Sequence, residues 1–244
     1  MPKTKSFIRF LNETDKEKLK EKSCLFTISV GQQTHEGEHF RATIELLNAT
    51  FKSCTMLVDD SLQRHTIAIQ QEFEPEYYYE MSIKEGDLWL ERNEKYYGKL
   101  TNLEKIIRWD TWLKHADFDL KRNAILNLIE QDSTYKSAFE QSINEFTIKL
   151  QERTTDNKYV DIERAKRLSF DFIVEECTAL CLWPELNCHY EVYPNLHNSA
   201  INETRQRFVL AYTPHLINQI TLGFRNAAQL KPQRFIILNQ MSTI

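Results

Sequence analysis

Glycine is scarce in this chain, with five glycines among 244 residues. None of them belongs to a G-x-G-x-x-G fingerprint or to a G-x4-G-K-S/T phosphate loop. Both motifs depend on glycine because the backbone has to approach a phosphate group closely. The sequence therefore lacks the usual signatures of a dinucleotide site or a P-loop, and we expect no cofactor.

Long apolar runs are also absent. No segment approaches the ~18–20 consecutive apolar residues that a membrane-spanning helix needs. The N-terminal stretch MPKTKSFIRFLNETDKEK has no apolar core followed by a small-residue cleavage site, so it does not resemble a secretory signal. These features predict a cytoplasmic protein without membrane contact.

Cysteine is present in an odd number, five, without the spacing of a disulfide framework. Four nearby residues could in principle bind zinc, namely Cys177, Cys181, Cys188 and His189. However, Cys177 and Cys181 lie in a helical stretch rich in Leu, Ala and Val, whereas structural zinc sites favour a tight knuckle. We therefore predict buried, reduced thiols and no metal site.

The composition, 41% apolar and 27% charged, is typical of a globular protein, and the length predicts a single domain over residues 1–244. The formal net charge of -4 argues against a strongly basic nucleic-acid-binding protein. A local patch can still bind phosphates, because these contacts need clustered charge and not a basic total.

Apolar runs on either side of a helical pattern predict a βαβ unit. Strands are predicted at Cys24–Val30 and Ser53–Asp59, with a helix at Glu38–Leu47 between them. This order indicates a parallel sheet and the α/β class. Further helices are predicted at Pro75–Tyr97, Leu103–His115, Phe118–Glu130, Tyr135–Arg153 and Val160–Leu182.

Two later apolar runs, Tyr190–Tyr193 and Phe235–Leu238, can complete the sheet. Ligands of such sheets bind beyond the carboxyl ends of the strands. Ser29 lies at the end of the first predicted strand and Tyr193 at the end of a later one, so a shared pocket is possible.

Ser29 lies in the sequence T-I-S-V-G, between a buried strand and the turn-forming Gly31. A hydroxyl at such a turn can be presented to a pocket beside backbone amides that act as oxyanion donors. The alternative is a strand-end serine whose hydroxyl bonds the local backbone. The T-x-S-x-G pattern differs from the G-x-S-x-G elbow of α/β-hydrolases, which gives that family little support.

Glu176 is the second candidate, because it interrupts a mostly apolar helical stripe. The neighbouring stripe, which carries Glu175, is far more polar. We expect Glu175 to be solvated and Glu176 to face the core, where its pKa would shift. Alternatively, Glu176 is a structural carboxylate bonded to Arg64 or to the backbone. The apolar stripe reads Ala165, Ser169, Phe172, Glu176 and Leu180.

The stretch Gly86–Leu100 could align Arg92, Lys95 and Lys99 on one helical face. Seven Lys/Arg stand against six Asp/Glu between residues 84 and 114, so this region is only locally basic. A solvated face with ion pairs explains the pattern nearly as well as RNA binding does. Basic residues continue downstream at Lys105, Arg108 and Lys114.

Several segments taken together resemble one family, the tRNA-dependent cyclodipeptide synthases, which join two aminoacyl groups from tRNA into a ring. The matches keep the family order from about residue 23 to residue 196, and they are strong jointly. The Tyr-Pro pair resembles the mark of one of the two family subgroups. The matching segments are Ile28–Gln32 followed by His35–Gly37 and Phe40, Asp60–His65, Gly86–Leu90 with Arg92-Asn93, Phe172–Glu176, and Tyr193-Pro194.

The resemblance implies a monomeric Rossmann-type fold, with a mostly parallel sheet flanked by helices, similar to the catalytic domains of class I aminoacyl-tRNA synthetases but without ATP. It implies that Ser29 becomes esterified by a first aminoacyl group, that Glu176 binds its amine, and that Tyr193 positions this amine. Two aminoacyl-tRNAs are consumed per turnover. The implied substrate contacts are Thr27, Gly31, Gln32, Phe172 and Pro194. The implied tRNA contacts are Arg92, Lys95, Lys99, Lys105 and Arg108.

Two positions depart from the family pattern. Phe172 replaces a usual tyrosine, so either Glu176 alone anchors the amine or a nearby tyrosine such as Tyr190 substitutes. Thr27 replaces a common glycine, which narrows the first pocket and favours a small first amino acid.

Two other functions remain open from the residues alone. A serine hydrolase of small esters would need a His or carboxylate base for Ser29, and His35 is the only histidine close to it in sequence. The other is a noncatalytic tRNA-binding relative of the synthetases.

Overall fold

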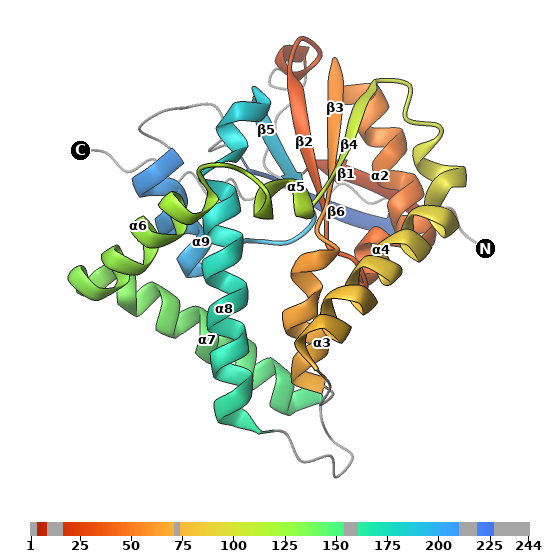
Figure 1. The fold of residues 1–244 in the computed structure, drawn as a ribbon. Coiled ribbons are helices and arrows are strands. Elements are labelled where there is room, and N and C mark those ends of the chain that lie inside the picture. Colours follow the sequence, from red (N-terminus) through yellow and green to blue (C-terminus); the bar gives the residue numbers. More distant parts are fainter. Residues whose placement is uncertain (1–3, 9–16, 71–73, 154–160, 210–218, 227–244) are drawn as a thin grey trace.

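A computed structural model describes residues 4–8, 17–70, 74–153, 161–209 and 219–226 (Figure 1). Its centre is a six-stranded sheet with the order β1-β6-β5-β2-β3-β4. Every neighbouring pair is parallel except β1 with β6. The strands are β1 (Thr4–Ile8), β2 (Ser23–Ile28), β3 (Ser53–Val58), β4 (Leu103–Arg108), β5 (Tyr190–Tyr193) and β6 (Gln219–Asn226).

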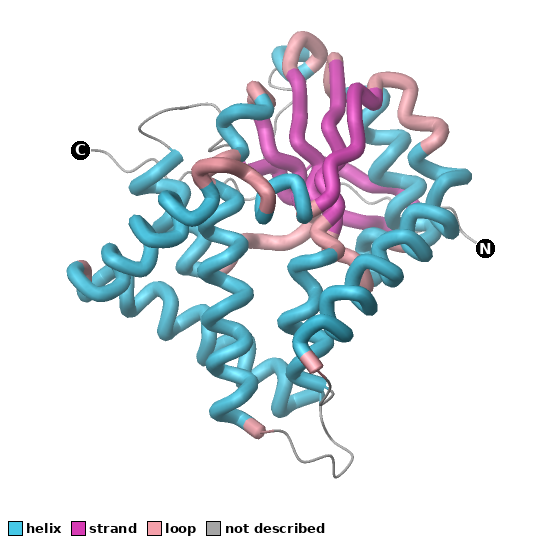
Figure 2. Tube along the Cα trace, viewed as in Figure 1, coloured by secondary structure: helices cyan, strands magenta, loops and turns pink. Residues whose placement is uncertain are grey.

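Helices cover both faces of the sheet (Figures 1 and 2), as a parallel sheet with two apolar faces requires. α2 (Gly37–Thr50) and α4 (Pro75–Tyr97) pack on one face of the sheet. Together with every second side chain of β2 and β3 they form one hydrophobic core. α8 (Ile162–Leu180) contributes to the opposite core. The other helices are α3 (Arg64–Gln70), α5 (Asp110–Leu113), α6 (Phe118–Gln131), α7 (Ser133–Arg153) and α9 (Ser199–Thr204).

Four shorter helical turns connect these elements. Three are 3-10 turns and the last is a π-helical turn. They are η1 (Gln33–His35), η2 (Ser61–Gln63), η3 (Trp183–Leu186) and η4 (Arg205–Val209).

The predicted βαβ unit is confirmed, since β2 and β3 pair in parallel across α2, with Cys24 opposite Cys54. The predicted strand at Tyr190–Tyr193 is also confirmed. Strands β1 and β6 were not predicted, and the predicted strand Phe235–Leu238 lies outside the described residues.

The predicted helix Leu103–His115 is wrong, because this segment forms β4 followed by the short α5. β4 lies at the edge of the sheet and pairs with β3 alone. Three consecutive residues of its LEKIIR sequence are exposed, so β4 lacks the run of consecutive buried residues that β2 and β3 have. Tertiary pairing decides the structure of such an edge segment.

The prediction that the cysteines are buried in the core is confirmed for four of the five, and the fifth, Cys181, is partly exposed. Cys177 and Cys188 belong to the α8-side core, and Cys24 and Cys54 to the opposite one. All five thiols are free. No helix among the described residues has the length and apolar content that would let it cross a bilayer.

Candidate active site

Three polar side chains meet at one edge of the sheet. Ser29 follows β2, Asp59 follows β3, and Tyr193 ends β5. These strands are adjacent and parallel, in the order β5-β2-β3, so their carboxyl ends lie side by side. This edge is where α/β sheets bind their ligands, and the predicted proximity of Ser29 and Tyr193 is confirmed.

The Ser29 hydroxyl is held by side chains and not by its own backbone. Its Oγ donates to Asp59 Oδ2 at 2.9 Å and lies 3.1 Å from the Tyr193 hydroxyl. Asp59 Oδ1 accepts the Val30 amide at 3.0 Å, so one carboxylate holds both the hydroxyl and the following peptide. The alternative of a backbone-bonded serine therefore does not describe this residue.

His35 contacts the backbone of Ser29. The Ser29 amide donates to His35 Nδ1 at 2.9 Å, and the same ring nitrogen lies 3.2 Å from the Ser29 carbonyl. Burial lowers the pKa of His35 to about 4, against a smaller opposing effect of the Ser29 backbone. A neutral ring that bonds the Ser29 backbone is not in place to deprotonate Oγ, so His35 is not the base that a hydrolase would need.

Burial raises the pKa of Asp59 well above its usual range, although the Ser29 hydroxyl and the Val30 amide oppose this. The nearby charges of Glu176 and Asp60 raise it further. Burial also raises the pKa of the Tyr193 hydroxyl, which therefore keeps its proton at neutral pH. Ser29 thus lies between one carboxyl group and one phenol.

Glu176 lies on α8 and is only partly exposed. Burial and the charge of Glu191 raise its pKa to about 8, and Arg205 opposes this shift. Its charge also raises the pKa of Asp59 and Tyr193, so the three acids lie in one neighbourhood. Within the described residues its carboxyl group has no hydrogen-bond partner, which leaves it able to bind a substrate cation.

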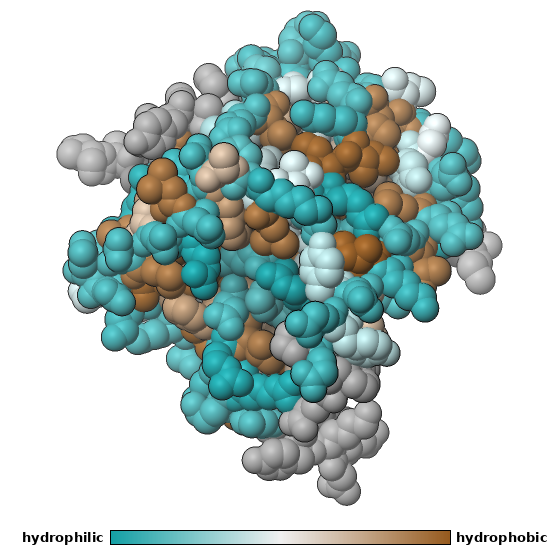
Figure 3. All heavy atoms as spheres, in the orientation of Figure 1, coloured by the Kyte–Doolittle hydropathy of each residue, from teal (hydrophilic) through white to brown (hydrophobic). Residues whose placement is uncertain are grey.

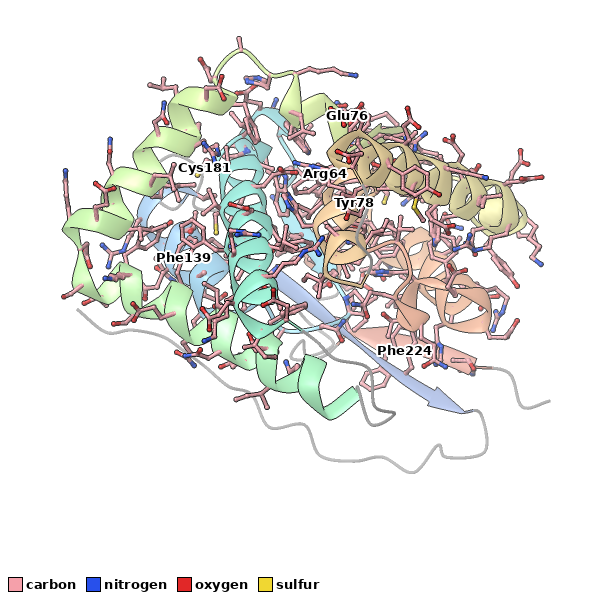
Figure 4. All side chains as sticks on the ribbon, turned by 60° about the horizontal axis from the view of Figure 1, so that its bottom comes forward. Arg64, Glu76, Tyr78, Phe139, Cys181 and Phe224 are labelled. Atoms are coloured by element: carbon pink, nitrogen blue, oxygen red, sulfur yellow. The ribbon has the colours of Figure 1, made fainter. Side chains whose placement is uncertain are left out.

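Glu175 is buried, so the prediction of a solvated Glu175 is wrong. Its oxygens accept hydrogen bonds from Arg64 Nη1 and Trp109 Nε1, both at 2.8 Å, and from Arg64 Nη2. His65 Nε2 lies 3.3 Å away. Arg64 extends from α3, which packs beside α8 (Figure 4). α8 packs against α3 on one flank and against α6 and α7 elsewhere, so its polar stripe faces protein and not solvent. The structural bond to Arg64 that was considered for Glu176 is made by Glu175 instead.

A buried charge network under Tyr193 was not predicted. Glu191 on β5 is fully buried and pairs with Arg205 and with His197 Nε2, the latter at 2.9 and 3.0 Å. Burial alone would raise its pKa, but the charges of His197 and Arg205 lower the pKa to about 2. The His197 ring stacks on Tyr193 at 5.3 Å between centroids, and Thr27 Oγ1 donates to Glu191 at 3.3 Å. The network therefore supports the orientation of Tyr193.

Comparison with solved structures identifies the family. The structure of a CDPS (cyclodipeptide synthase) from Fluoribacter dumoffii is similar to this chain, with 36% sequence identity and a TM-score of 0.87. The similarity covers 92% of this chain and 99% of that one. The chain belongs to the cyclodipeptide synthase family.

More distant structures share the fold of this synthase. A cyclodipeptide synthase from Candidatus Glomeribacter gigasporarum, bound to Phe-tRNAPhe, has 16% identity and a TM-score of 0.70 over 91% of this chain and 93% of its own. A Mycobacterium tuberculosis structure, described as relating cyclodipeptide synthetases to type I tRNA synthetases, has 10% identity and a TM-score of 0.58 over 93% and 95%. No protein-family model matches the sequence, and no curated protein does either. The predicted family and Rossmann-type fold are confirmed.

The substrate contacts predicted for the synthase fall around Ser29 to different degrees. Gly31 and Gln32 form the exposed turn after Ser29, and the Gln32 amide donates to the Ser29 carbonyl at 3.1 Å. Gly31 has a φ of +87°, which glycine adopts without strain. Pro194 is buried directly after Tyr193. Thr27 is buried, and its hydroxyl donates to Glu191.

Phe172 lies on α8 and packs edge-on against His65, with ring centroids 6.3 Å apart. Tyr190 cannot replace the hydroxyl missing from Phe172. It pairs with Cys24 and packs on Phe51, at the opposite end of β2 from Ser29. At about 3.3 Å per residue the strand separates these ends by roughly 16 Å, so the alternative based on Tyr190 is wrong.

The predicted tRNA contacts are mostly exposed. Arg92 and Lys95 lie on α4, whereas Lys99 follows the end of that helix. Arg92 pairs with Glu36 at 2.6 Å. Lys105 lies on the edge strand β4 and is exposed. Hydrophilic side chains interrupted by apolar ones cover this part of the surface (Figure 3).

Arg108 differs from the other predicted contacts because it is tied into the protein. Its guanidinium pairs with Asp60 and Asp87 and donates to the Ile83 carbonyl at 3.0 Å. These contacts connect β4, α4 and the turn after β3, which gives Arg108 a structural function.

Proposed function

We propose that this single-domain synthase forms a cyclic dipeptide from two aminoacyl-tRNAs through an aminoacyl ester on Ser29. The observation that carries the proposal is the Ser29 hydroxyl, bonded to Asp59 and Tyr193 at the carboxyl edge of the sheet, with the unpaired carboxyl of Glu176 in the same neighbourhood. A covalent intermediate divides the reaction into two acyl transfers, each easier than a single concerted one.

In the first transfer, Ser29 Oγ attacks the ester carbonyl of aminoacyl-tRNA. The Oγ–C bond forms, the bond from that carbon to the tRNA ribose oxygen breaks, and tRNA leaves. The Ser29 and Val30 amides are committed to His35 and Asp59. The Gly31 amide has no partner among the described residues, and we assign it as a donor to the developing oxyanion.

Glu176 binds the α-ammonium of the acyl group on Ser29. A carboxyl group whose pKa is about 8 in the free enzyme becomes ionised when a cation approaches, because the opposite charge lowers its pKa. After the ammonium gives one proton to Glu176, Tyr193 positions the amine for attack on the ester carbonyl of the second aminoacyl-tRNA. The amide bond forms, the bond from that carbon to the ribose oxygen breaks, and the second tRNA leaves with the remaining amine proton on its ribose oxygen. The free amine of the resulting dipeptidyl-enzyme then attacks the seryl ester, the C–Oγ bond breaks, and the amine proton returns to Ser29 Oγ as the cyclic dipeptide is released. Proximity favours this ring closure.

The tRNA is bound by the exposed cations on α4 and beyond it. Lys95, Lys99 and Lys105 are available for phosphate contacts, and Arg92 joins them when a phosphate replaces Glu36 as its partner. Each phosphate contact releases counterions and makes binding dependent on salt. We assign Arg108 a smaller share because Asp60 and Asp87 neutralise it.

The enzyme is further proposed to be a cytoplasmic monomer of the Tyr-Pro subgroup. Tyr193-Pro194 supports the subgroup. Thr27 supports a small first amino acid. It lies two residues before Ser29, and its side chain, held by the hydrogen bond to Glu191, narrows the pocket for the first side chain.

Expression in a bacterium followed by mass spectrometry of the medium tests the proposal. We expect cyclic dipeptides with the wild-type enzyme and none with Ser29→Ala. Purified enzyme mixed with aminoacyl-tRNA should gain the mass of one aminoacyl group. Cyclic dipeptide formation by Ser29→Ala at the wild-type level would refute the covalent mechanism.

A further inference from the structure

Asp59 is the group most closely tied to the nucleophile. It is 8% exposed, and its carboxylate accepts both the Ser29 hydroxyl and the Val30 amide. Its own amide donates to the Ile28 carbonyl at 2.9 Å. One hydrogen bond thus joins the first residue after β3 to the end of β2 and two join it to the turn that follows, so the carboxylate is fixed relative to Oγ before any substrate binds.

The two partners of the Ser29 hydroxyl are chemically different. Tyr193 is a phenol that keeps its proton, since burial raises its pKa, so it serves as a donor. Asp59 in its ionised form can only accept a proton. His35, the nearest ring nitrogen, is bonded to the Ser29 amide instead. Among the described residues, Asp59 is therefore the hydrogen-bonded acceptor for the hydroxyl proton.

We propose that Asp59 is the general base that activates Ser29, an assignment that rests on the proposed covalent mechanism. As the Oγ–C bond forms, the hydroxyl proton moves to Asp59 Oδ2. When the bond to the ribose oxygen breaks, that oxygen takes a proton from Asp59, directly or through the Tyr193 hydroxyl. The carboxylate is then regenerated, and the step needs no other reactant.

Its surroundings suit this function. Burial raises the pKa of Asp59, and a base of higher pKa accepts a proton more readily provided that it is ionised. The titratable groups that face it are Tyr193 from β5, Glu176 from α8 and the adjacent Asp60. Glu176 and Asp60 disfavour its ionised form, so acylation should accelerate as pH rises through the pKa of Asp59.

The decisive variant is Asp59→Asn. An asparagine oxygen can still accept the Val30 amide, while its amide group cannot take a proton from Oγ. We expect acyl-enzyme formation, measured by intact mass in a single turnover, to slow by roughly 10²–10⁴-fold, as for other general bases. The rise in rate with pH should also flatten, whereas thermal unfolding should confirm a folded protein.

Asp110→Asn is the matched control. Asp110 is half-buried after the next strand, β4, and bonds Tyr79 and Lys114 without contacting Ser29. We expect it to keep the wild-type rate of acylation and its pH profile. Equal acylation rates in wild-type and Asp59→Asn enzymes would overturn the assignment and leave the covalent mechanism intact.

A small fluorophosphonate separates this inference from the proposed function, because it phosphonylates an activated serine and releases fluoride without tRNA. We expect labelling at Ser29 that Asp59→Asn slows by at least tenfold and Ser29→Ala abolishes. If this pattern holds while aminoacyl-tRNA adds no mass, the proposed function fails and Asp59 remains the base. Labelling of wild-type and Asp59→Asn at the same rate would refute the inference, as would no labelling at Ser29.

Discussion

The Glu175 network should be a main source of stability for the side of the sheet that α8 covers. Glu175→Ala removes the carboxylate that pairs with Arg64 and accepts the Trp109 indole N–H. Removing one partner of a buried ion pair costs roughly 3–5 kcal/mol, because the other charge stays buried without compensation. The Arg64 side chain is 22% exposed and reaches water in part, which favours the lower end.

A loss of about 3 kcal/mol corresponds to a fall in Tm of roughly 6–12 °C for a chain of this size. Differential scanning calorimetry measures it directly. The matched control is Glu163→Ala on the same helix, which removes an exposed pair with Lys166 at 2.9 Å and should cost less than about 1 kcal/mol.

The pH dependence gives an independent check. Burial alone would raise the pKa of Glu175, but the hydrogen bonds from His65 and Arg64 and the charge of Arg64 lower it. Its stabilising contribution is therefore complete above the unfolded pKa, near 4.5, and is lost as pH falls through the folded pKa. The Tm difference between wild type and Glu175→Ala should shrink below about pH 4. Equal Tm values for the two alanine variants would show that the network is not stabilising.

Three further predictions concern other parts of the molecule. Glu176→Gln should keep the fold and reduce cyclic dipeptide formation by at least tenfold. Because the folded pKa of Glu176 is raised to about 8, wild type should lose stability as pH rises from 5 to 8, and the neutral glutamine should abolish this loss in urea unfolding. Replacing Arg92, Lys95 and Lys99 together with Glu should weaken aminoacyl-tRNA binding and reduce its salt slope in filter binding, and an unchanged slope would locate the RNA elsewhere. Gly31→Ala should cost about 1 kcal/mol of unfolding free energy, because the φ of +87° strains a side chain even though no atom lies within 4 Å of an added Cβ.

Much of the fold follows from local sequence patterns. The buried runs of β2 and β3 and the helix between them carry their signal in consecutive residues, and the strand Tyr190–Tyr193 is bounded by turn residues. The edge strand β4 has no such local signal, because one side of it faces solvent and its sequence alternates irregularly between apolar and charged residues. Its identity as a strand depends on pairing with β3, which no local pattern contains.

The site could be predicted only in part, for a similar reason. Ser29 and Tyr193 follow apolar strands, so their position at the sheet edge could be derived from the sequence. Asp59 also ends a predicted strand, but its role as the partner of Ser29 depends on the order of the strands. The one available signal for Glu191 was an acidic residue inside a strand expected to be buried on both faces.

The contrast between Glu175 and Glu176 shows how tertiary packing assigns different functions to two adjacent carboxylates. The two side chains project about 100° apart around α8. Glu175 faces Arg64 and His65 of α3, which favour its charged form and lower its pKa, and it accepts the indole N–H of Trp109, which follows β4. Glu176 lies near Glu191 and Asp59, where burial and like charge raise its pKa. A carboxylate that is already paired stabilises the fold and is closed to substrate, whereas one kept unpaired reduces stability at neutral pH and can bind an incoming ammonium.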